Sequence, residues 1–195
     1  MRIATYNCQN IQAITKREDI KKWAKNRQID VLALTETHLL GQAQEGGPHE
    51  EYTTYFSPDP DECTTFRFGR KSEEAGVAIM IRTSLVPSIL QIQSHGSRIM
   101  SMRLNTYPPT RYIVVYMPQA CGMSWEGKSE YYDRLNDLMD TMPKKEPLYI
   151  LGDFNARLQA RPKDEEEYIG PYVYGRGPDY ATEQQARAHE NRECF

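Results

Sequence analysis

The sequence predicts a layered α/β domain, and two observations carry that prediction. Near the N-terminus, residues 2–7, 15–26 and 29–35 have the patterns of a strand, a helix and a second strand joined by short connections. Two strands linked in this way are expected to be parallel, with a right-handed crossover. Later in the chain, four apolar residues at 148–151 run directly into Gly152 and a pair of polar groups. A continuous apolar run of this length is typical of a buried strand, here one that ends in a cleft.

Composition places the chain among globular proteins and excludes several other classes. With 195 residues, 39% of them hydrophobic and 26% charged, a single domain is the expectation. No apolar run approaches the roughly 18 residues that a membrane helix needs, so no membrane partner is expected. The four cysteines are scattered and form no CxxC pair, which disfavours a zinc site or a disulfide framework. We expect reduced thiols in an intracellular protein, either nuclear or cytoplasmic.

The net charge of −3 bears on the partners that the chain can bind. It provides no global basic field, which argues against tight, non-specific DNA binding in the absence of metal. It leaves open an enzyme that acts on phosphodiesters, because a bound metal ion supplies positive charge locally.

In the first part of the chain, each of the two predicted strands and the predicted helix has a recognisable sequence pattern. The first strand alternates in hydropathy and ends at Asn7. Thr15 is the expected N-cap of the helix, with Glu18 three residues later completing a capping box. The helix then runs to about residue 26, and the next strand ends at Glu36.

The middle of the chain contains a long irregular stretch followed by several strands. Residues 41–72 are rich in Gly, Pro, Asp and Thr and show no helix or strand periodicity. A loop this long is usually functional or contains short strands. Four strands are then expected, at 76–81, 88–93, 98–105 and 111–117. The last of them is apolar almost throughout, which indicates a central position in its sheet.

Toward the C-terminus the pattern first stays regular and then changes. An amphipathic helix is expected at 129–142, followed by the strand at 148–151. No strand is expected within 156–181, where the acidic run 164–167 is interpreted as a solvated face. From residue 182 the pattern turns helical again.

Polar side chains stand at the ends of several predicted strands. Asn7 and Glu36 end neighbouring strands, Tyr116 lies at the end of another, and Asp153 with Asn155 follows the strand at 148–151. Strand ends in a layered α/β domain meet at one edge of the sheet, where ligand sites are expected. Carboxylate and amide oxygens, completed by water and substrate phosphate, suit Mg²⁺. Without a cation, two carboxylates in one cleft would repel each other.

Each of these residues also has an ordinary structural interpretation. Alone, Asn7 is consistent with a turn cap, Glu36 with an ion pair to a surface lysine, and Tyr116 with a ring packed in the core. Gly152 to Asn155 is also consistent with a simple strand-to-turn junction. No histidine stands in a recognisable catalytic spacing.

Taken together, the strand-end residues resemble a known family. Four motifs occur in order: Thr5-Tyr6-Asn7, Leu34-Thr35-Glu36-Thr37, Val115-Tyr116-Met117-Pro118 and Gly152-Asp153-Phe154-Asn155. With the strand Arg98-Ile99-Met100-Ser101-Met102, they resemble the endonuclease/exonuclease/phosphatase superfamily, which has the DNase I-like fold. The segment Tyr174-Gly175-Arg176-Gly177 and the helix start at 191–195 are most similar to endonuclease domains of non-LTR retrotransposons and to craniofacial-development-protein-like relatives.

The resemblance implies a two-sheet α/β sandwich with flanking helices, in four layers, and Mg²⁺-dependent hydrolysis of phosphodiesters. It implies DNA as the nicked substrate and Mn²⁺ as an alternative ion. Carried over by position, Glu36 would ligate the metal and Asn7 would support the metal and the phosphate. Tyr116 would contact the scissile phosphate, Asp153 would orient or deprotonate the attacking water, and Asn155 would help to bind the transition state.

One departure from the family pattern leaves three hypotheses open. Nothing after Asn155 matches the Ser-Asp-His strand with which the family normally ends. We therefore expect residues 1–195 to form a single domain that is incomplete at its C-terminus, with the last strands missing. The chain is then a metal-dependent endonuclease whose activity is weak or lost, or a phosphatase or phosphodiesterase of the same fold acting on a small phosphoester or RNA. The third hypothesis is a non-catalytic remnant of a retrotransposon-derived protein.

Overall fold

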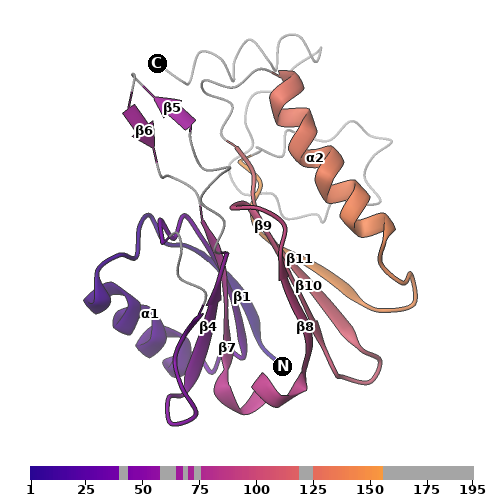
Figure 1. Cartoon of the computed structure of the whole chain (residues 1–195). Coiled ribbons are helices and arrows are strands. Elements are labelled where there is room, and N and C mark those ends of the chain that lie inside the picture. Colours follow the sequence, from indigo (N-terminus) through magenta and orange to yellow (C-terminus); the bar gives the residue numbers. More distant parts are fainter. Residues whose placement is uncertain (40–43, 58–64, 68–69, 73–75, 119–124, 156–195) are drawn as a thin grey trace, which may run out of the picture.

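The computed structural model describes residues 1–39, 44–57, 65–67, 70–72, 76–118 and 125–155. Within this part of the chain, two β-sheets pack face to face and a helix lies outside each of them (Figure 1). In chain order the elements are β1 (Ile3–Asn7), α1 (Ile14–Asn26), β2 (Val31–Thr35), β3 (Gln44–Glu45), β4 (Tyr52–Phe56), β5 (Thr65–Arg67), β6 (Arg70–Ser72), β7 (Val77–Arg82), the 3₁₀-helix η1 (Thr83–Ser88), β8 (Ile89–Ser94), β9 (Ile99–Leu104), β10 (Thr110–Tyr116), α2 (Trp125–Asp140) and β11 (Leu148–Asp153). The predicted two-sheet α/β sandwich is thereby confirmed.

The first sheet has five strands in the order β1-β2-β7-β4-β3. β1 and β2 are parallel, with Asn7 opposite Thr35, as predicted for a strand–helix–strand unit. β7 pairs antiparallel with both β2 and β4, so β2 and β7 are buried along almost their whole length. Strands β3 to β6 all lie within the irregular stretch 41–72. Of the two interpretations of that stretch, the one with hidden short strands is confirmed.

The second sheet has four strands in the order β11-β10-β9-β8. β10 lies between two neighbours and is almost completely buried, as its apolar sequence predicts. β11 runs parallel to β10 and is the outermost strand of this sheet within the described residues. The prediction of a buried strand at 148–151 is therefore wrong: Tyr149 is 45% exposed and stacks on Tyr112. Four apolar residues in a row do not distinguish a central strand from an outer one that keeps one flank open.

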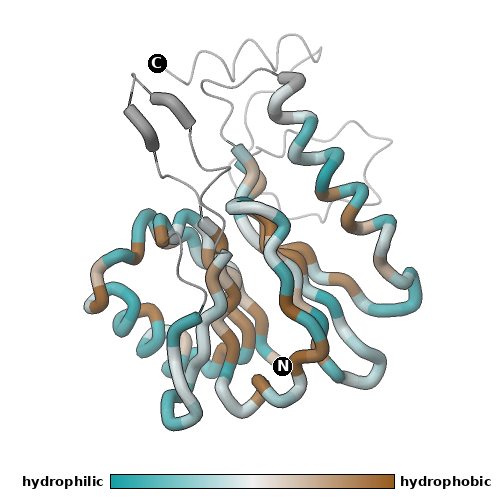
Figure 2. The backbone as a smooth tube through the Cα atoms, viewed as in Figure 1, coloured by the Kyte–Doolittle hydropathy of each residue, from teal (hydrophilic) through white to brown (hydrophobic). Residues whose placement is uncertain are grey.

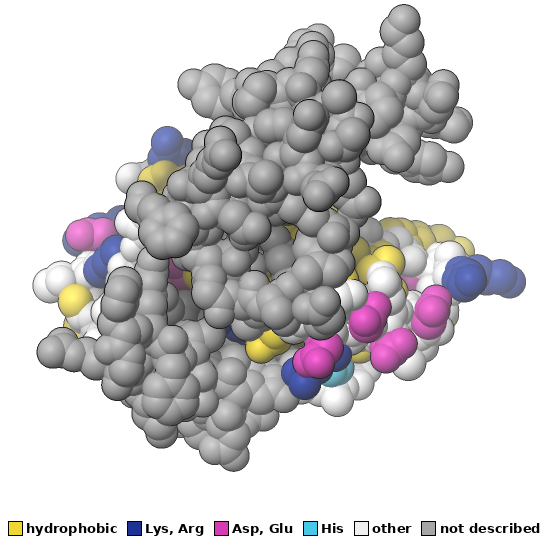
Figure 3. All heavy atoms as spheres, turned by 90° about the horizontal axis from the view of Figure 1, so that it is seen from above, with side chains coloured by type: hydrophobic (Ala, Val, Ile, Leu, Met, Phe, Trp, Pro, Cys, Tyr) yellow, Lys and Arg dark blue, Asp and Glu magenta, His cyan; other side chains and the backbone are white. Residues whose placement is uncertain are grey.

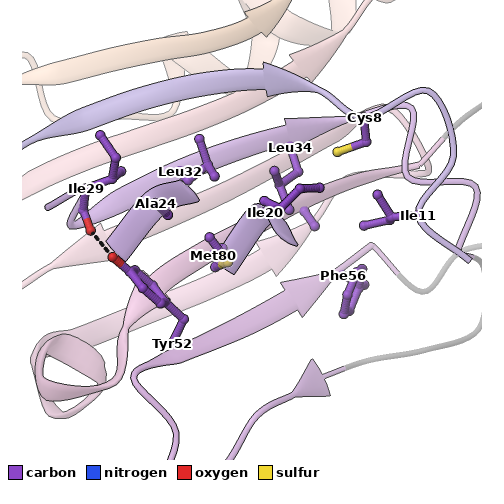
Figure 4. Close-up of a cluster of buried hydrophobic side chains, with 11 residues drawn as sticks. Cys8, Ile11, Ile20, Ala24, Ile29, Leu32, Leu34, Tyr52, Phe56 and Met80 are labelled. Carbon is purple, nitrogen blue, oxygen red and sulfur yellow. Dashed lines mark hydrogen bonds between the residues drawn. The ribbon is translucent and has the colours of Figure 1, made fainter. Parts of the chain in front are cut away.

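Three clusters of apolar side chains hold the four layers together. Hydrophobic residues recur along the strands of both sheets (Figure 2). The first cluster lies between α1 and the first sheet and includes Ile20, Ala24, Leu32, Leu34 and Met80, with the Tyr52 hydroxyl donating to the Ile29 carbonyl at 2.8 Å (Figure 4). The second lies between the two sheets and includes Val31, Ile79, Ile81, Met100, Met102 and Val114. The third lies between the second sheet and α2 and includes Ile99, Ile113, Val115, Leu135 and Met139. Burial of these faces is the main favourable term for the fold.

Both helices begin earlier than predicted. α1 begins at Ile14 after Ala13, which makes no side-chain cap, so the predicted capping box of Thr15 and Glu18 is wrong. Glu18 instead forms an ion pair with Lys21 at 3.0 Å. The chain is turned into α1 by Asn10, whose Oδ1 accepts a hydrogen bond from Gln12 N at 2.8 Å. α2 begins at Trp125, before the predicted start at 129, and includes Gly127 in its first turn.

The remaining predictions concern the membrane and the end of the chain. Among the described residues, no helix combines the length and apolarity required to cross a membrane. The acidic run 164–167, the segment Tyr174 to Gly177, the helix start at 191–195 and the helix expected from 182 lie outside the described residues.

Gly152 is the residue on which the closeness of β10 and β11 depends. Its φ is +134°, a conformation that side chains rarely adopt, and it stands opposite Val115 in the parallel pair. A Cβ at this position would lie 1.9 Å from the Val115 carbonyl oxygen, which is backbone and cannot rotate away. The glycine therefore lets the two strands stay paired up to Asp153.

Replacing Gly152 with alanine is expected to lower the free energy of unfolding by about 3 kcal/mol or more, because the new methyl group forces the strands apart. Urea unfolding followed by circular dichroism measures this. Gly47→Ala is the matched control, since a Cβ at Gly47 meets no atom within 4 Å. Equal stability of the two variants would contradict this role for Gly152.

Candidate active site

The candidate site lies where four strands of the two sheets end. Asn7 is the last residue of β1, Glu36 follows β2, Tyr116 ends β10 and Asp153 ends β11. Backbone hydrogen bonds continue beyond the strands, from Cys8 N to the Thr35 carbonyl at 2.8 Å and from Met117 N to the Asp153 carbonyl at 2.9 Å. These bonds hold the strand ends rigidly, which suits a site that must keep its groups in a fixed geometry.

The side-chain amide of Asn7 joins the two sheets at this edge. Its Nδ2 donates to Glu36 Oε1 at 2.9 Å and to Asp153 Oδ2 at 3.2 Å. The two carboxylates, one from each sheet, thus converge on one NH₂ group. A neutral amide only partly offsets the repulsion between two carboxylates held so close together.

The Tyr116 hydroxyl approaches the same carboxylate from inside the sandwich. It donates to Glu36 Oε1 at 3.0 Å, while the residue as a whole is only 3% exposed. Burial raises the pKa of the Tyr116 phenol well above its usual range, and the neighbouring Glu36 carboxylate raises it further. The phenol therefore stays protonated at neutral pH and acts as a hydrogen-bond donor.

Asn155 fixes the turn that follows β11. Its backbone N–H donates to Asp153 Oδ1 at 2.8 Å, and its Nδ2 donates to the Met117 carbonyl at 2.6 Å. Asn155 has φ +44° and Glu36 has φ +53°, so both lie in the left-handed region. Residues other than glycine adopt this conformation at a cost, and such positions cluster at functional sites. The sharp turns place both residues at the ends of their strands.

All five residues singled out in the sequence lie at this one edge. For Asn7, the turn role and the site role coexist, because its Oδ1 accepts from Gln9 N at 3.1 Å while its NH₂ group faces the carboxylates. The Tyr116 ring packs in the core between the sheets while its hydroxyl reaches Glu36. Within the described residues, Glu36 forms no ion pair with a lysine. The catalytic and ligand roles of the five residues stay predictions.

Sequence reasoning missed Arg98 as a functional candidate. Arg98 precedes β9 and is 6% exposed, and its Cζ lies 4.9 Å from the centre of the Tyr116 ring. Its Nη1 donates a long hydrogen bond of 3.4 Å to the Tyr116 carbonyl. A signal was present, because Arg98 alternates with Met100 and Met102, which face the interior of the sandwich. A charge on that face is unusual.

The donor set is compatible with a hard divalent cation. Glu36 and Asp153 offer carboxylate oxygens, and Mg²⁺ usually takes one or two carboxylates together with water and phosphate oxygens. No group of three or more His, Cys, Asp or Glu side chains is arranged to hold a metal in the part of the chain that the structure covers. A cation bound here would thus depend on water and substrate for its other ligands.

Comparisons with known proteins bear on the family and the fold of this chain. A model of the endonuclease/exonuclease/phosphatase family matches residues 4–189. A search of curated proteins found no match to the sequence.

Three solved structures are similar in fold. An AP endonuclease from Archaeoglobus fulgidus has a TM-score of 0.58 and 20% identity, over 80% of this chain and 58% of that one. The catalytic domain of Xenopus laevis APE2 has a TM-score of 0.54 and 18% identity, over 84% and 62%. The endonuclease domain of TRAS1, a telomere-specific non-LTR retrotransposon, has a TM-score of 0.52 and 13% identity, over 80% and 61%.

At these identities the likeness to the three structures establishes the fold. This chain spans about three fifths of the length of each of them. What these proteins act on is therefore no direct evidence about the substrate of this chain.

Replacing Asn7 with aspartate is expected to make stability depend strongly on pH, because three carboxylates would then share the site. Repulsion from the two existing carboxylates raises the folded-state pKa of the introduced carboxyl group, so stability is retained at low pH and lost as the pH rises through that pKa. Without divalent ions, we expect Asn7→Asp to lose about 1–3 kcal/mol of unfolding free energy between pH 4 and pH 7 relative to the parent protein.

Urea unfolding at a series of pH values in EDTA makes this measurement. The control is Asn105→Asp, which adds the same charge at an exposed position after β9. The same pH dependence in both variants would contradict the convergence of Asn7, Glu36 and Asp153.

Proposed function

The chain belongs to the endonuclease/exonuclease/phosphatase family, and from this premise we propose that it is a metal-dependent endonuclease that nicks DNA. The observation that carries the proposal is the Asn7 amide, which brings the carboxylates of Glu36 and Asp153 together beside the Tyr116 hydroxyl. A turn junction or a surface ion pair would not require polar groups from four different strands at one point.

Glu36 is the residue that would hold the metal ion, with the Asp153 carboxylate beside it. Enzymes of this family generally use divalent metals, and two carboxylates that converge on one point provide oxygen donors for such an ion. We propose Mg²⁺, with Mn²⁺ as an alternative because both ions take oxygen ligands. Bound here, the ion would neutralise negative charge that develops on the phosphate. A ligand role for Asn7 would require its side-chain amide to turn, because its Oδ1 accepts a hydrogen bond from Gln9 N while its NH₂ group faces the carboxylates.

The remaining catalytic roles fall to protein side chains. Asp153 keeps one oxygen fixed by the Asn155 N–H, so its carboxylate is held in one orientation from which it can orient a water molecule and accept its proton. Tyr116 stays protonated and can donate a hydrogen bond to a phosphate oxygen. Asn155 holds the turn, and we propose that it also stabilises the transition state. Preorganised donors of this kind act without reorganisation during the reaction.

Surface charge suggests the direction from which a nucleic acid approaches. Acidic side chains gather on the side of the molecule where α2 lies (Figure 3), and α2 exposes Glu130, Asp133, Asp137 and Asp140. A phosphate backbone would be repelled by this surface. Beside the site, Lys16 donates to the Gln9 carbonyl at 3.1 Å. We propose that DNA reaches the site from the side of Lys16.

Two alternatives are tested by a substrate panel. The family includes phosphatases, so a small phosphoester or RNA is the second candidate substrate. Turnover of such a substrate with DNA left intact would favour it. No turnover of any substrate, with metal binding absent, would favour a non-catalytic protein of retrotransposon origin. An intracellular location, nuclear or cytoplasmic, stays a prediction.

Mg²⁺-dependent nicking of supercoiled DNA is expected for the chain, and Asp153→Ala is expected to lower its rate about 100-fold or more because the attacking water loses its base. Gel separation of nicked from supercoiled plasmid measures the rate. Asp133→Asn, on the exposed face of α2, is the matched control. Nicking that persists unchanged in Asp153→Ala would remove this residue from the mechanism.

Metal binding is expected to depend on Glu36 even where turnover is slow. Glu36→Gln keeps the shape of the side chain but removes its charge, so its dissociation constant for Mn²⁺ should rise about tenfold or more. Isothermal titration calorimetry measures this directly, with Glu130→Gln on α2 as the control. Equal affinity in the parent protein and Glu36→Gln would place the metal elsewhere.

A further inference from the structure

Arg98 is a charged side chain placed where the fold alone would favour an apolar one. It is 6% exposed, and its guanidinium lies near the rings of Tyr116 and of Tyr131 on α2. Within the described residues it forms no ion pair, and its Nε has no hydrogen-bond partner. Burying a charge without such compensation is costly, and a well-packed apolar side chain is often more stabilising.

The partners that Arg98 does have are aromatic. Its Cζ lies 4.9 Å from the centre of the Tyr116 ring and 5.8 Å from that of Tyr131 on α2. Both distances are within the range of a cation–π interaction, which is stronger when the groups are desolvated. The guanidinium therefore stacks on the ring whose hydroxyl donates to Glu36.

We propose that Arg98 is a positioning residue that fixes the Tyr116 ring and so keeps its hydroxyl directed at Glu36. The consequence for catalysis rests on the proposed function, whereas the orientation of the ring does not.

The side chain of Arg98 can be changed without breaking the backbone frame. The backbone N–H of Tyr116 donates to the Arg98 carbonyl at 2.9 Å, and this bond does not depend on the side chain. Arg98→Met fills similar volume and removes the charge, and Arg98→Lys keeps the charge. The matched control is Arg82→Met, because Arg82 stacks on the Tyr52 ring at 5.7 Å while pairing with Asp30 outside the site.

The orientation of the ring is tested in metal-free protein that carries 3-fluorotyrosine at position 116. At neutral pH, a ring held in one orientation places its fluorine in one environment and gives one narrow fluorine NMR resonance. Arg98→Met should broaden or split this resonance, Arg98→Lys should restore it in part, and Arg82→Met should leave it unchanged. An identical spectrum in Arg98→Met and the parent protein would overturn the proposal.

The consequence for catalysis is tested by a double-mutant cycle. Arg98→Met should lower kcat for DNA nicking about tenfold with little change in KM. Added to Tyr116→Phe, it should have little further effect, because the hydroxyl through which it acts is gone. The same fall in both backgrounds would show that Arg98 acts through general stability and would overturn the proposal. If the parent protein does not nick DNA, the proposed function fails, and the fluorine spectrum alone decides the role of Arg98.

Discussion

The hydrogen bonds from one amide group connect the two halves of this protein at its candidate site. Asn7 Nδ2 donates to Glu36 beside it in the first sheet and to Asp153 at the end of the second sheet. The packed apolar core between the sheets sets their separation and brings these strand ends to one edge. At that edge, the amide and the Tyr116 hydroxyl hold the carboxylates of the site in one arrangement.

Several energetically unfavourable features lie near the Asn7 amide. Two carboxylates converge there, Glu36 and Asn155 adopt left-handed backbone conformations, and the Arg98 guanidinium is buried among aromatic rings. None of these features stabilises the folded state. Each is retained because the buried layers on both sides of the site provide enough favourable packing to offset its cost. Such a concentration of unfavourable terms is expected where charge must be stabilised during a reaction.

The sequence predicted the arrangement of the fold better than its local details. Asn7, Glu36, Tyr116 and Asp153 were found because each follows a strand, and strand ends meet at one edge. The predicted Thr15 cap was wrong because the turn around Asn10 leads the chain into α1 instead. The exposure of β11 was not predictable, because the number of neighbours of a strand is a property of the whole sheet.

The alternation of Arg98 with Met100 and Met102 was a signal in the sequence, but its contact with the Tyr116 ring was not predictable, since that ring lies on another strand. The central claim is that Glu36 and Asp153 form one metal site across the two sheets. Anomalous X-ray scattering from crystals grown with Mn²⁺ tests it most directly. The account predicts a manganese peak in contact with the Glu36 carboxylate and beside that of Asp153. A peak elsewhere, or no ion at this edge at saturating Mn²⁺, would contradict it.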